Sequence, residues 1–302
     1  LALQADKLLQ MDGHITDRNV KNCQGSGNCL YGCKANKKQT PNVTWIPEIL
    51  FLDGLILSCA PVEKVIINDR KAEAVVGAFV HPYTKKIGCK FQVSAKKGII
   101  LVASATHTPC ILQRSGLTLP SIGQNFQAHP GSTVIGIYPE PVVTKNMVGA
   151  TQGWATTKFR NEGFKLETLS MPLELMLGRL PGTGEDFKKN LELFPYMALW
   201  IAVVRADHSK GYVKYNRLTK SPSVYYNMSE NDLRKLRKGM HTLAKMHFAA
   251  GAHTVLPGIH GLPPSLKADQ VDLILTAKLD PQNYVTILSH LFGGAVMGND
   301  PK

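Results

Sequence analysis

The order of hydrophobic and polar residues differs between the first and second halves of the chain. In the first half, residues 74–81 and 90–95 alternate apolar and polar positions around a turn at residues 83–88, which predicts a β-hairpin. Residues 98–103 then form a continuous apolar run bounded by turn signals, and residues 110–114 follow with helical character. Such a run predicts a strand that is buried on both faces, as in a parallel sheet.

After residue 149 the pattern favours an antiparallel sheet followed by one long helix. The predicted strands are residues 197–204, 211–215 and 223–226. Ser229 and Asp232 have the spacing of a helix start, because the serine oxygen can accept hydrogen bonds from the free amides of the first turn. Gly251 marks the expected end of this helix. Residues recur along it at helical spacing: Leu233, Leu236, Met240, Leu243 and His247.

Shorter elements complete the predicted order. The expected helices are residues 2–10, 45–52 and 267–275, and the expected strands are residues 55–59 and 62–67. The change from parallel-sheet material to an antiparallel sheet predicts two domains, with a boundary between residues 130 and 149.

The composition fits a folded protein without a membrane-spanning helix. Of the 302 residues, 44% are hydrophobic and 19% are charged, so the chain can bury a core. The most apolar early run, residues 46–62, is interrupted by Glu48 and Asp53, and no run reaches the roughly 18 apolar residues that a membrane span needs. The chain lacks an initiator Met and opens as a helix already under way, so we expect a fragment of a longer protein.

The net charge of +13 allows several anionic partners, but its distribution argues against nucleic acid. Lys and Arg are scattered, with short runs only at residues 34–38 and 234–238. Neither run is interleaved with the aromatic residues that are typical of a nucleic-acid surface. We therefore expect a solvated basic surface and no nucleic-acid partner.

The first segment with candidate chemistry is the strand-to-helix turn at residues 99–109. Small residues after a buried strand let the backbone approach a ligand closely, and the amides at a helix start point at anionic groups. Taken alone, the same residues also suit an ordinary sheet-to-helix turn.

Five segments, taken in order, resemble signature segments of the glucose–methanol–choline (GMC) oxidoreductases. Residues 101–117 resemble the family's second signature, in which a strand ends in small residues. In that signature Thr or Ser, then Pro, then two or three aliphatic residues and finally Ser-Gly-Leu follow the strand. Residues 122–130 resemble its Val-Gly-x-Asn-Leu-x-x-His-Pro run, and residues 57–62 resemble its adenine-side strand. Residues 251–252 resemble the segment before the C-terminal region, and residues 289–301 resemble His-x-x-Gly-Thr-x-Arg-Met-Gly-x-Asp-Pro.

The resemblance implies an FAD-dependent oxidoreductase that acts on the CH–OH group of alcohols. In that chemistry the carbon-bound hydride passes to flavin N5 while a base accepts the hydroxyl proton, and His290 is the implied catalytic residue. Without the resemblance, a histidine beside a Gly-rich turn would also suit a structural hydrogen bond. The implied FAD-binding residues are Val62, Ser104, Ala105, Thr108, Pro109, Asn125 and His129.

The implied fold class is α/β (α+β). A partial Rossmann-like FAD-binding domain would occupy residues 1–135, an antiparallel-sheet substrate domain packed with helices would occupy residues 136–288, and residues 289–302 would begin the C-terminal flavin-side segment. No Gly-x-Gly-x-x-Gly sequence occurs in the chain, so the pyrophosphate-binding turn is missing. We expect the isolated chain to hold FAD poorly and to purify without flavin absorbance.

Four residues depart from the family pattern near the candidate site. Ser104 stands where the family has Gly, and Gln113 stands where it has an aliphatic residue. Gly294 replaces the usual Thr, and Val296 replaces the usual Arg. The loss of a guanidinium at Val296 predicts a changed geometry near His290.

A cysteine-rich loop indicates the subgroup. Cys23, Cys29 and Cys33 lie within eleven residues, and this segment through residue 47 resembles the Cys-rich loop of long-chain alcohol oxidases. Thiolates also bind metals and iron–sulfur centres, but a pair of cysteines separated by two residues and a nearby His at ligand spacing are both missing. We expect a packed, flavin-facing loop and no metal, with a Cys-ligated electron-transfer protein as the rival.

The expected substrates are bulky or long-chain apolar alcohols, and oxygen, a quinone or a cytochrome would take the electrons. Peripheral membrane contact is left open, as is the compartment. The alternative function is a truncated or degenerate, non-catalytic homologue that acts as a structural or interaction subunit.

Overall fold

The computed structural model describes residues 1–25, 29–142, 153–171 and 173–298, which divide into two compact units. The large-sheet unit comprises Leu1–Pro47, His129–His208 and Met228–Ser289. The small-sheet unit comprises Glu48–Ala128, Ser209–Asn227 and His290–Lys302. Three stretches named in the predictions lie outside the described residues: residues 26–28 of the cysteine loop, residues 143–149 at the expected domain boundary, and residues 299–302 of the last segment.

Seven described strands form the sheet of the large-sheet unit, in the order β1-β6-β7-β8-β5-β11, with β12 also paired to β5. The pairs between the first six are antiparallel. The central strands β5 and β8 are buried along nearly their whole length, because both faces of the sheet are covered. The strands are β1 (Gly13–Ile15), β5 (Gln127–Ile137), β6 (Trp154–Thr156), β7 (Phe164–Leu169), β8 (Met197–Val204), β11 (Thr254–Leu256) and β12 (Thr286–Phe292).

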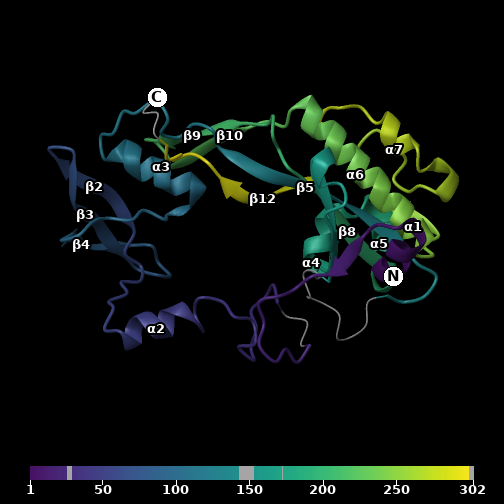
Figure 1. Cartoon of the computed structure of the whole chain (residues 1–302), viewed down its shortest axis with the longest axis horizontal. Helices are drawn as coiled ribbons and strands as arrows, with labels where there is room; N and C mark the ends of the chain where they lie inside the picture. Colours follow the sequence, from purple (N-terminus) through teal and green to yellow (C-terminus); the bar gives the residue numbers. More distant parts are fainter. Residues whose placement is uncertain (26–28, 143–152, 172, 299–302) are drawn as a thin grey trace. The chain divides into compact units, whose positions relative to one another are not determined.

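The long helix α6 (Glu230–Ala249) covers one face of this sheet and lies beside β8 (Figure 1). It begins as predicted, because the Ser229 Oγ accepts a hydrogen bond from the Asp232 N–H at 3.2 Å. Gly251 follows its last turn with φ 94°, a left-handed value that suits glycine. The predicted stripe is buried along its whole length: Leu233, Leu236, Met240, Leu243 and His247.

The opposite face of the sheet packs against the segment around α4 (Leu173–Met176) and α5 (Gly184–Glu192). Met197 and Leu199 of β8 point to this face, since successive side chains of a strand alternate between the two faces. Two further helices belong to the unit: α1 (Ala2–Leu9), which packs on α6, and α7 (Leu273–Thr276). The buried members of the cluster are Ile135, Ile137, Met176, Leu180, Met197, Leu199 and Leu256.

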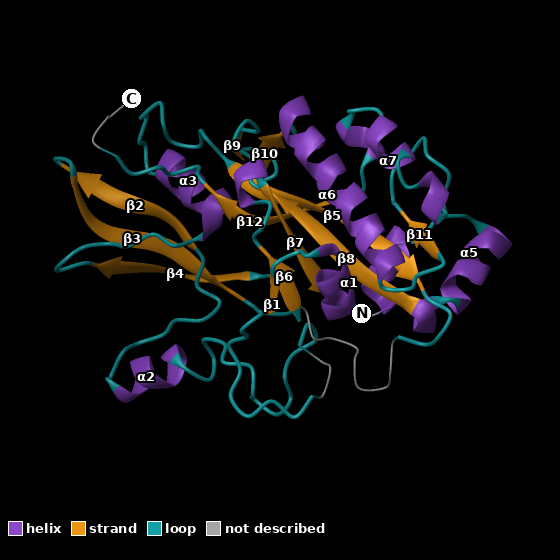
Figure 2. Cartoon of the chain, turned by 45° about the vertical axis from the view of Figure 1, so that its right-hand side comes forward, coloured by secondary structure: helices purple, strands orange, loops and turns teal. Residues whose placement is uncertain are grey.

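The small-sheet unit contains an antiparallel meander and a separate antiparallel hairpin in its described part (Figure 2). The helix α3 (Ser104–Arg114) packs against β2 of the meander and β9 of the hairpin. The helix α2 (Trp45–Phe51) has no buried residue. The strands are β2 (Val62–Asn68), β3 (Lys71–Val80), β4 (Ile87–Ser94), β9 (Gly211–Asn216) and β10 (Ser221–Tyr226).

The predicted mixed α/β class with antiparallel sheets is confirmed. The predicted hairpin is β3–β4, and the three later predicted strands are β8, β9 and β10. The contiguous domain limits at residues 135 and 288 stay a prediction, since grouping by contact collects segments that are distant in the sequence. Among the described residues, no helix combines the length and the apolar content of a membrane-spanning segment.

Residues 98–103 do not form the predicted buried strand. Ile100 and Val102 are each 88% exposed, and neither belongs to a strand of the described chain. An apolar run shows a preference for burial, but a parallel strand also needs paired neighbours to cover it. Residues 55–59 likewise form no strand, and in place of one helix at residues 267–275 there is a 3-10 turn (Ala268–Gln270) followed by α7.

Candidate functional site

Side-chain hydroxyl groups of α3 accept hydrogen bonds from backbone N–H groups at the start of this helix. Ser104 has φ 76°, a left-handed value that glycine adopts more readily, which accounts for the glycine that the GMC pattern has at this position. The Ser104 Oγ accepts a hydrogen bond from the His107 N–H at 3.3 Å. The Thr108 Oγ1 accepts one from the Ala103 N–H at 3.1 Å. Two predicted FAD-binding residues, Ser104 and Thr108, therefore shape the first turn.

Pro109 leaves one carbonyl of this helix without its usual donor. Proline has no N–H, so the Ala105 carbonyl, four residues earlier, lacks its helical hydrogen bond from that position. Gly294 approaches the same carbonyl, since a Cβ on Gly294 would lie 2.7 Å from Ala105 O. Gly294 also has φ 76°, so both space and backbone conformation require glycine here. The threonine of the GMC pattern would not fit this geometry.

The segment after His290 also contacts the loop that carries Asn125. The Gly123 N–H donates a hydrogen bond to the Gly294 carbonyl at 2.7 Å. A Cβ on Gly293 would lie 1.8 Å from the Asn125 carbonyl oxygen, so this approach is possible only for glycine. The segment after His290 thus joins the Asn125 loop to the start of α3 within the small-sheet unit.

A pocket of about 470 Å³ lies between α3, the start of β2 and the β9–β10 hairpin. Val62 lines this α3 pocket, as do Cys110 and Ile111 from the buried side of the helix. Arg114 adds positive charge, and its guanidinium carbon lies 5.1 Å from the centre of the Tyr215 ring. Apolar walls beside a cationic group suit a flat heterocycle that carries an anionic substituent.

The two histidines of the prediction belong to different units. His129 lies half-buried in β5, where its Nδ1 is 3.3 Å from the Val204 carbonyl oxygen. His290 is exposed near the end of β12 and has φ 52°, a backbone value that is uncommon for residues other than glycine. Ser289, the residue before it, donates from Oγ to the His129 carbonyl at 3.4 Å. The catalytic role of His290 and the cofactor role of His129 stay predictions.

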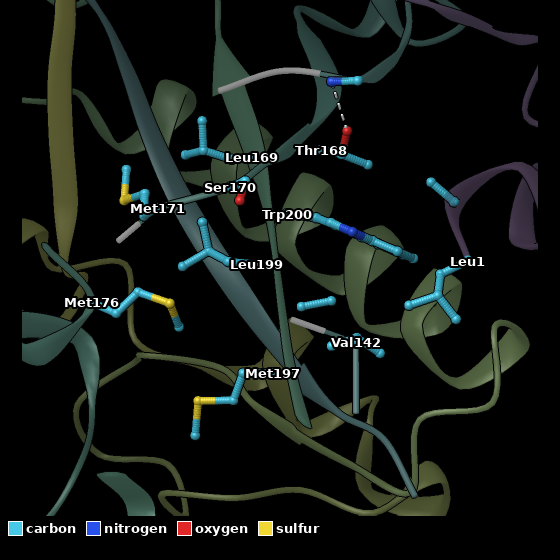
Figure 3. Close-up of a pocket in the computed structure, with 13 residues that line it drawn as sticks. Leu1, Val142, Thr168, Leu169, Ser170, Met171, Met176, Met197, Leu199 and Trp200 are labelled. Atoms are coloured by element: carbon cyan, nitrogen blue, oxygen red, sulfur yellow. Dashed lines mark hydrogen bonds between the residues drawn. The ribbon is translucent and has the colours of Figure 1, made fainter. Parts of the chain in front are cut away.

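The large-sheet unit has a separate apolar pocket of about 360 Å³, which we name the methionine pocket (Figure 3). Met171, Met176 and Met197 line it together with Leu199 and Trp200. The methionines come from three different segments, so no local sequence pattern predicts them. Flexible thioether side chains adapt to irregular apolar ligands, and this lining suits a hydrocarbon group.

The cysteine loop shows no metal site in its described part. Cys23 is exposed, whereas Cys29 and Cys33 are half-buried, and all three are free thiols. The pKa of the Cys33 thiol lies below its usual value, because backbone N–H groups at Lys38 and Lys37 hydrogen-bond to the sulfur. Across the described residues, no group of three or more His, Cys, Asp or Glu side chains is placed to hold a metal ion.

Comparison with known proteins relates the chain to oxidoreductases. Residues 2–131 match the family model described as GMC oxidoreductase. A GMC-type oxidoreductase of Mycobacterium tuberculosis, described as uncharacterized, is 29% identical over 100% of this chain and 46% of its own length. A long-chain-alcohol oxidase of Arabidopsis thaliana is 26% identical over 79% of this chain and 33% of its own length. The chain therefore spans about half or less of the length of these relatives.

Solved structures show the same fold at lower identity. A pyridoxine 4-oxidase from Mesorbium loti superimposes with a TM-score of 0.57 and 16% identity, over 88% of this chain and 52% of that chain. A formate oxidase of Aspergillus oryzae gives a TM-score of 0.55 and 15% identity, over 78% of this chain and 50% of that chain. Residues 2–131 are thus similar to the GMC oxidoreductase family model, and the whole chain is similar to part of the GMC-type oxidoreductases of Mycobacterium tuberculosis.

Proposed function

We propose that the chain functions in an FAD-dependent oxidoreductase that oxidises the CH–OH group of alcohols. One observation carries this proposal: the start of α3, the Asn125 loop and the glycine pair after His290 meet in the small-sheet unit. The first two segments follow each other closely in the sequence, whereas the glycine pair lies 168 residues after Asn125, and each segment belongs to a different GMC-like motif. Their convergence, together with the GMC relationship, supports a common ligand site.

The residues around α3 fit FAD. The first turn of the helix offers backbone amides to an anionic group. The α3 pocket beside this turn has apolar walls that suit a flat ring system. When bound, FAD supplies the two-electron redox chemistry. The residues proposed to hold it are Val62, which lines the α3 pocket, and Ser104, Ala105, Thr108, Pro109, Asn125 and His129.

His290 is proposed to accept the hydroxyl proton of the alcohol. An imidazole can take up and release a proton near neutral pH, and the His290 side chain is exposed to an incoming substrate. Its left-handed backbone conformation is of the strained kind that gathers at functional sites. Both observations support the role.

The methionine pocket supports an apolar substrate. Its lining is dominated by Met, Leu and Trp side chains (Figure 3). The Thr168 hydroxyl accepts hydrogen bonds from the backbone N–H groups of Gly153 and Trp154. The relatives from Arabidopsis thaliana are long-chain-alcohol oxidases. We therefore favour bulky or long-chain apolar alcohols, with oxygen, a quinone or a cytochrome as the electron acceptor.

The test uses the protein expressed from its full reading frame and purified with FAD. Anaerobic addition of 1-decanol should bleach the visible flavin absorbance, and His290→Asn should slow the bleaching while leaving the flavin content unchanged. The matched control is His260→Asn, which removes another exposed histidine of the described chain.

Each outcome decides between the candidates. Equal bleaching rates for both variants would refute the role of His290. A protein that holds FAD but is reduced by no primary or secondary alcohol would support the non-catalytic homologue instead. Bleaching by ethanol that exceeds bleaching by 1-decanol would refute the apolar substrate class while leaving the redox proposal intact.

A further inference from the structure

The turn between β3 and β4, which we name the hairpin tip (residues 81–87), exposes two large apolar side chains. Tyr83 is 88% exposed and Ile87 is 74% exposed. Every residue from 81 to 90 is exposed, so the surrounding strand does not cover them. Single exposed apolar residues are common on folded proteins, so the charge and the order of the tip decide whether this pair has a role.

Hydrogen bonds within the hairpin tip hold its backbone in one arrangement. The His81 Nδ1 accepts from the Tyr83 N–H at 3.3 Å and from the Thr84 N–H at 3.1 Å. The His81 N–H donates to the Lys86 carbonyl at 2.9 Å, and the Lys85 N–H donates to the His81 carbonyl at 3.0 Å. An ordered tip loses less conformational entropy on binding than a flexible loop does, so it suits a contact surface.

The hairpin tip is also positively charged. Lys85 and Lys86 belong to it, and Lys90 follows on β4; all three are exposed. The surrounding sequence supplies no opposite charge, because residues 74–139 contain no Asp or Glu. On the neighbouring strand β2, Glu63 forms an ion pair with Arg114 at 3.5 Å. The tip therefore combines exposed apolar side chains with positive charge, and an anionic surface complements that charge.

We propose that the hairpin tip binds the surface of an anionic lipid membrane. Tyrosine is favoured at the membrane–water interface, because its ring is apolar and its hydroxyl is polar. Ile87 would enter the apolar layer, while the flexible lysine side chains reach the anionic headgroups. Nucleic acid fits less well, because an aliphatic side chain offers no stacking surface to a base. This contact needs neither flavin nor alcohol, so it goes beyond the proposed function.

The test is co-sedimentation of the protein, expressed from its full reading frame, with lipid vesicles. Vesicles of equal parts phosphatidylglycerol and phosphatidylcholine should bind it at least about tenfold more tightly than pure phosphatidylcholine, and added salt should weaken the binding. Two double variants should each weaken binding by at least about tenfold. One combines Tyr83→Ser with Ile87→Ser and removes the apolar contact, and the other combines Lys85→Glu with Lys86→Glu and reverses the charge.

Each variant has a matched control elsewhere on the chain. Lys188→Glu with Lys189→Glu alters two adjacent, exposed lysines of α5 and changes the net charge by the same amount. Leu218→Ser removes an apolar side chain that is 94% exposed outside the tip. Both controls should bind the anionic vesicles as tightly as the wild-type protein does.

The remaining outcomes contradict the proposal. Absence of binding to the anionic vesicles, or equal binding to the uncharged ones, would overturn it. Equal losses in the control variants would show that the tip has no special part in binding. Binding that depends on Lys85 and Lys86 but not on Tyr83 and Ile87, with equally tight binding to duplex DNA, would indicate a polyanion site and would overturn the membrane assignment.

Discussion

Lowering the pH tests the buried hydrogen-bond network around His247. This residue of α6 is fully buried, and its ring stacks on Trp200 with 3.9 Å between the ring centres. Its Nε2 lies 3.1 Å from the Val134 carbonyl and its Nδ1 lies 3.0 Å from the Tyr138 hydroxyl. A carbonyl can only accept, so Nε2 carries a proton. Burial lowers the pKa of His247 to about 3, so the ring is neutral at pH 7 and its Nδ1 accepts from the Tyr138 hydroxyl.

The expected loss of stability follows from the difference between the two states. In the unfolded chain the His247 pKa returns to about 6.5, so the unfolded state binds more protons wherever the pH lies between the two values. Its contribution to stability is complete above pH 6.5 and is lost as the pH falls toward 3. Each pKa unit is worth about 1.4 kcal/mol, so His247 alone should cost about 2 kcal/mol at pH 5 and about 3 kcal/mol at pH 4.

Urea unfolding at a series of pH values measures this cost, with His247→Gln as the comparison. Glutamine is neutral at every pH used and can donate to the Val134 carbonyl, so it removes the titration while keeping one hydrogen bond. The variant should be less stable at pH 7, and its free energy of unfolding should fall with pH by about one proton less than that of the wild type. Identical slopes for the two proteins between pH 6.5 and 4 would refute the reasoning.

Three substitutions test other contacts by urea unfolding. Gly293→Ala should destabilise the protein by several kcal/mol, because the new Cβ would lie 1.8 Å from the Asn125 carbonyl oxygen. The control is Gly251→Ala, whose Cβ would meet nothing within 4 Å and which should cost about 1 kcal/mol. Equal losses of stability for the two variants would contradict the close approach. Ser229→Ala should cost about 1 kcal/mol through loss of the α6 cap, and an unchanged midpoint would disprove the cap. Gln113→Leu, which introduces the aliphatic residue of the GMC pattern, should cost about 1 to 3 kcal/mol because both ends of the Gln113 amide bond to the backbone of β9; a stabilised variant would show that those bonds contribute little.

The elements that the sequence predicts best are those with local signals. The helix α6 has a capping serine at Ser229, an apolar stripe at helical spacing and Gly251 at its end, and all three lie where the pattern places them. His247 continues the stripe and is a core residue, as its position on the apolar face predicts. These signals need no knowledge of the rest of the chain, because a helix makes its hydrogen bonds within itself.

The candidate site is only partly predictable, because its contacts join distant segments. The motif resemblance predicts a role for each of Ala105, Asn125 and His290 separately, as FAD-binding or catalytic residues. It does not predict that Gly294 lies against Ala105. The left-handed backbone conformation at Gly294 accounts for the glycine that stands there in place of the family's threonine. The methionine pocket has no sequence signal, since it draws its lining from several separate elements.

The apolar run at residues 98–103 shows where pattern reading fails. Its composition predicts burial on both faces, yet Ile100 and Val102 are each 88% exposed in the described structure. Burying an aliphatic side chain is worth roughly 1.5 to 3 kcal/mol, so the preference that the pattern records is real. Whether such a segment becomes buried in a sheet depends on neighbouring strands from elsewhere in the chain. A strand, unlike a helix, cannot form its backbone hydrogen bonds within itself. Hydrophobic order therefore predicts which face of a segment favours burial, and the tertiary contacts determine whether that face is covered.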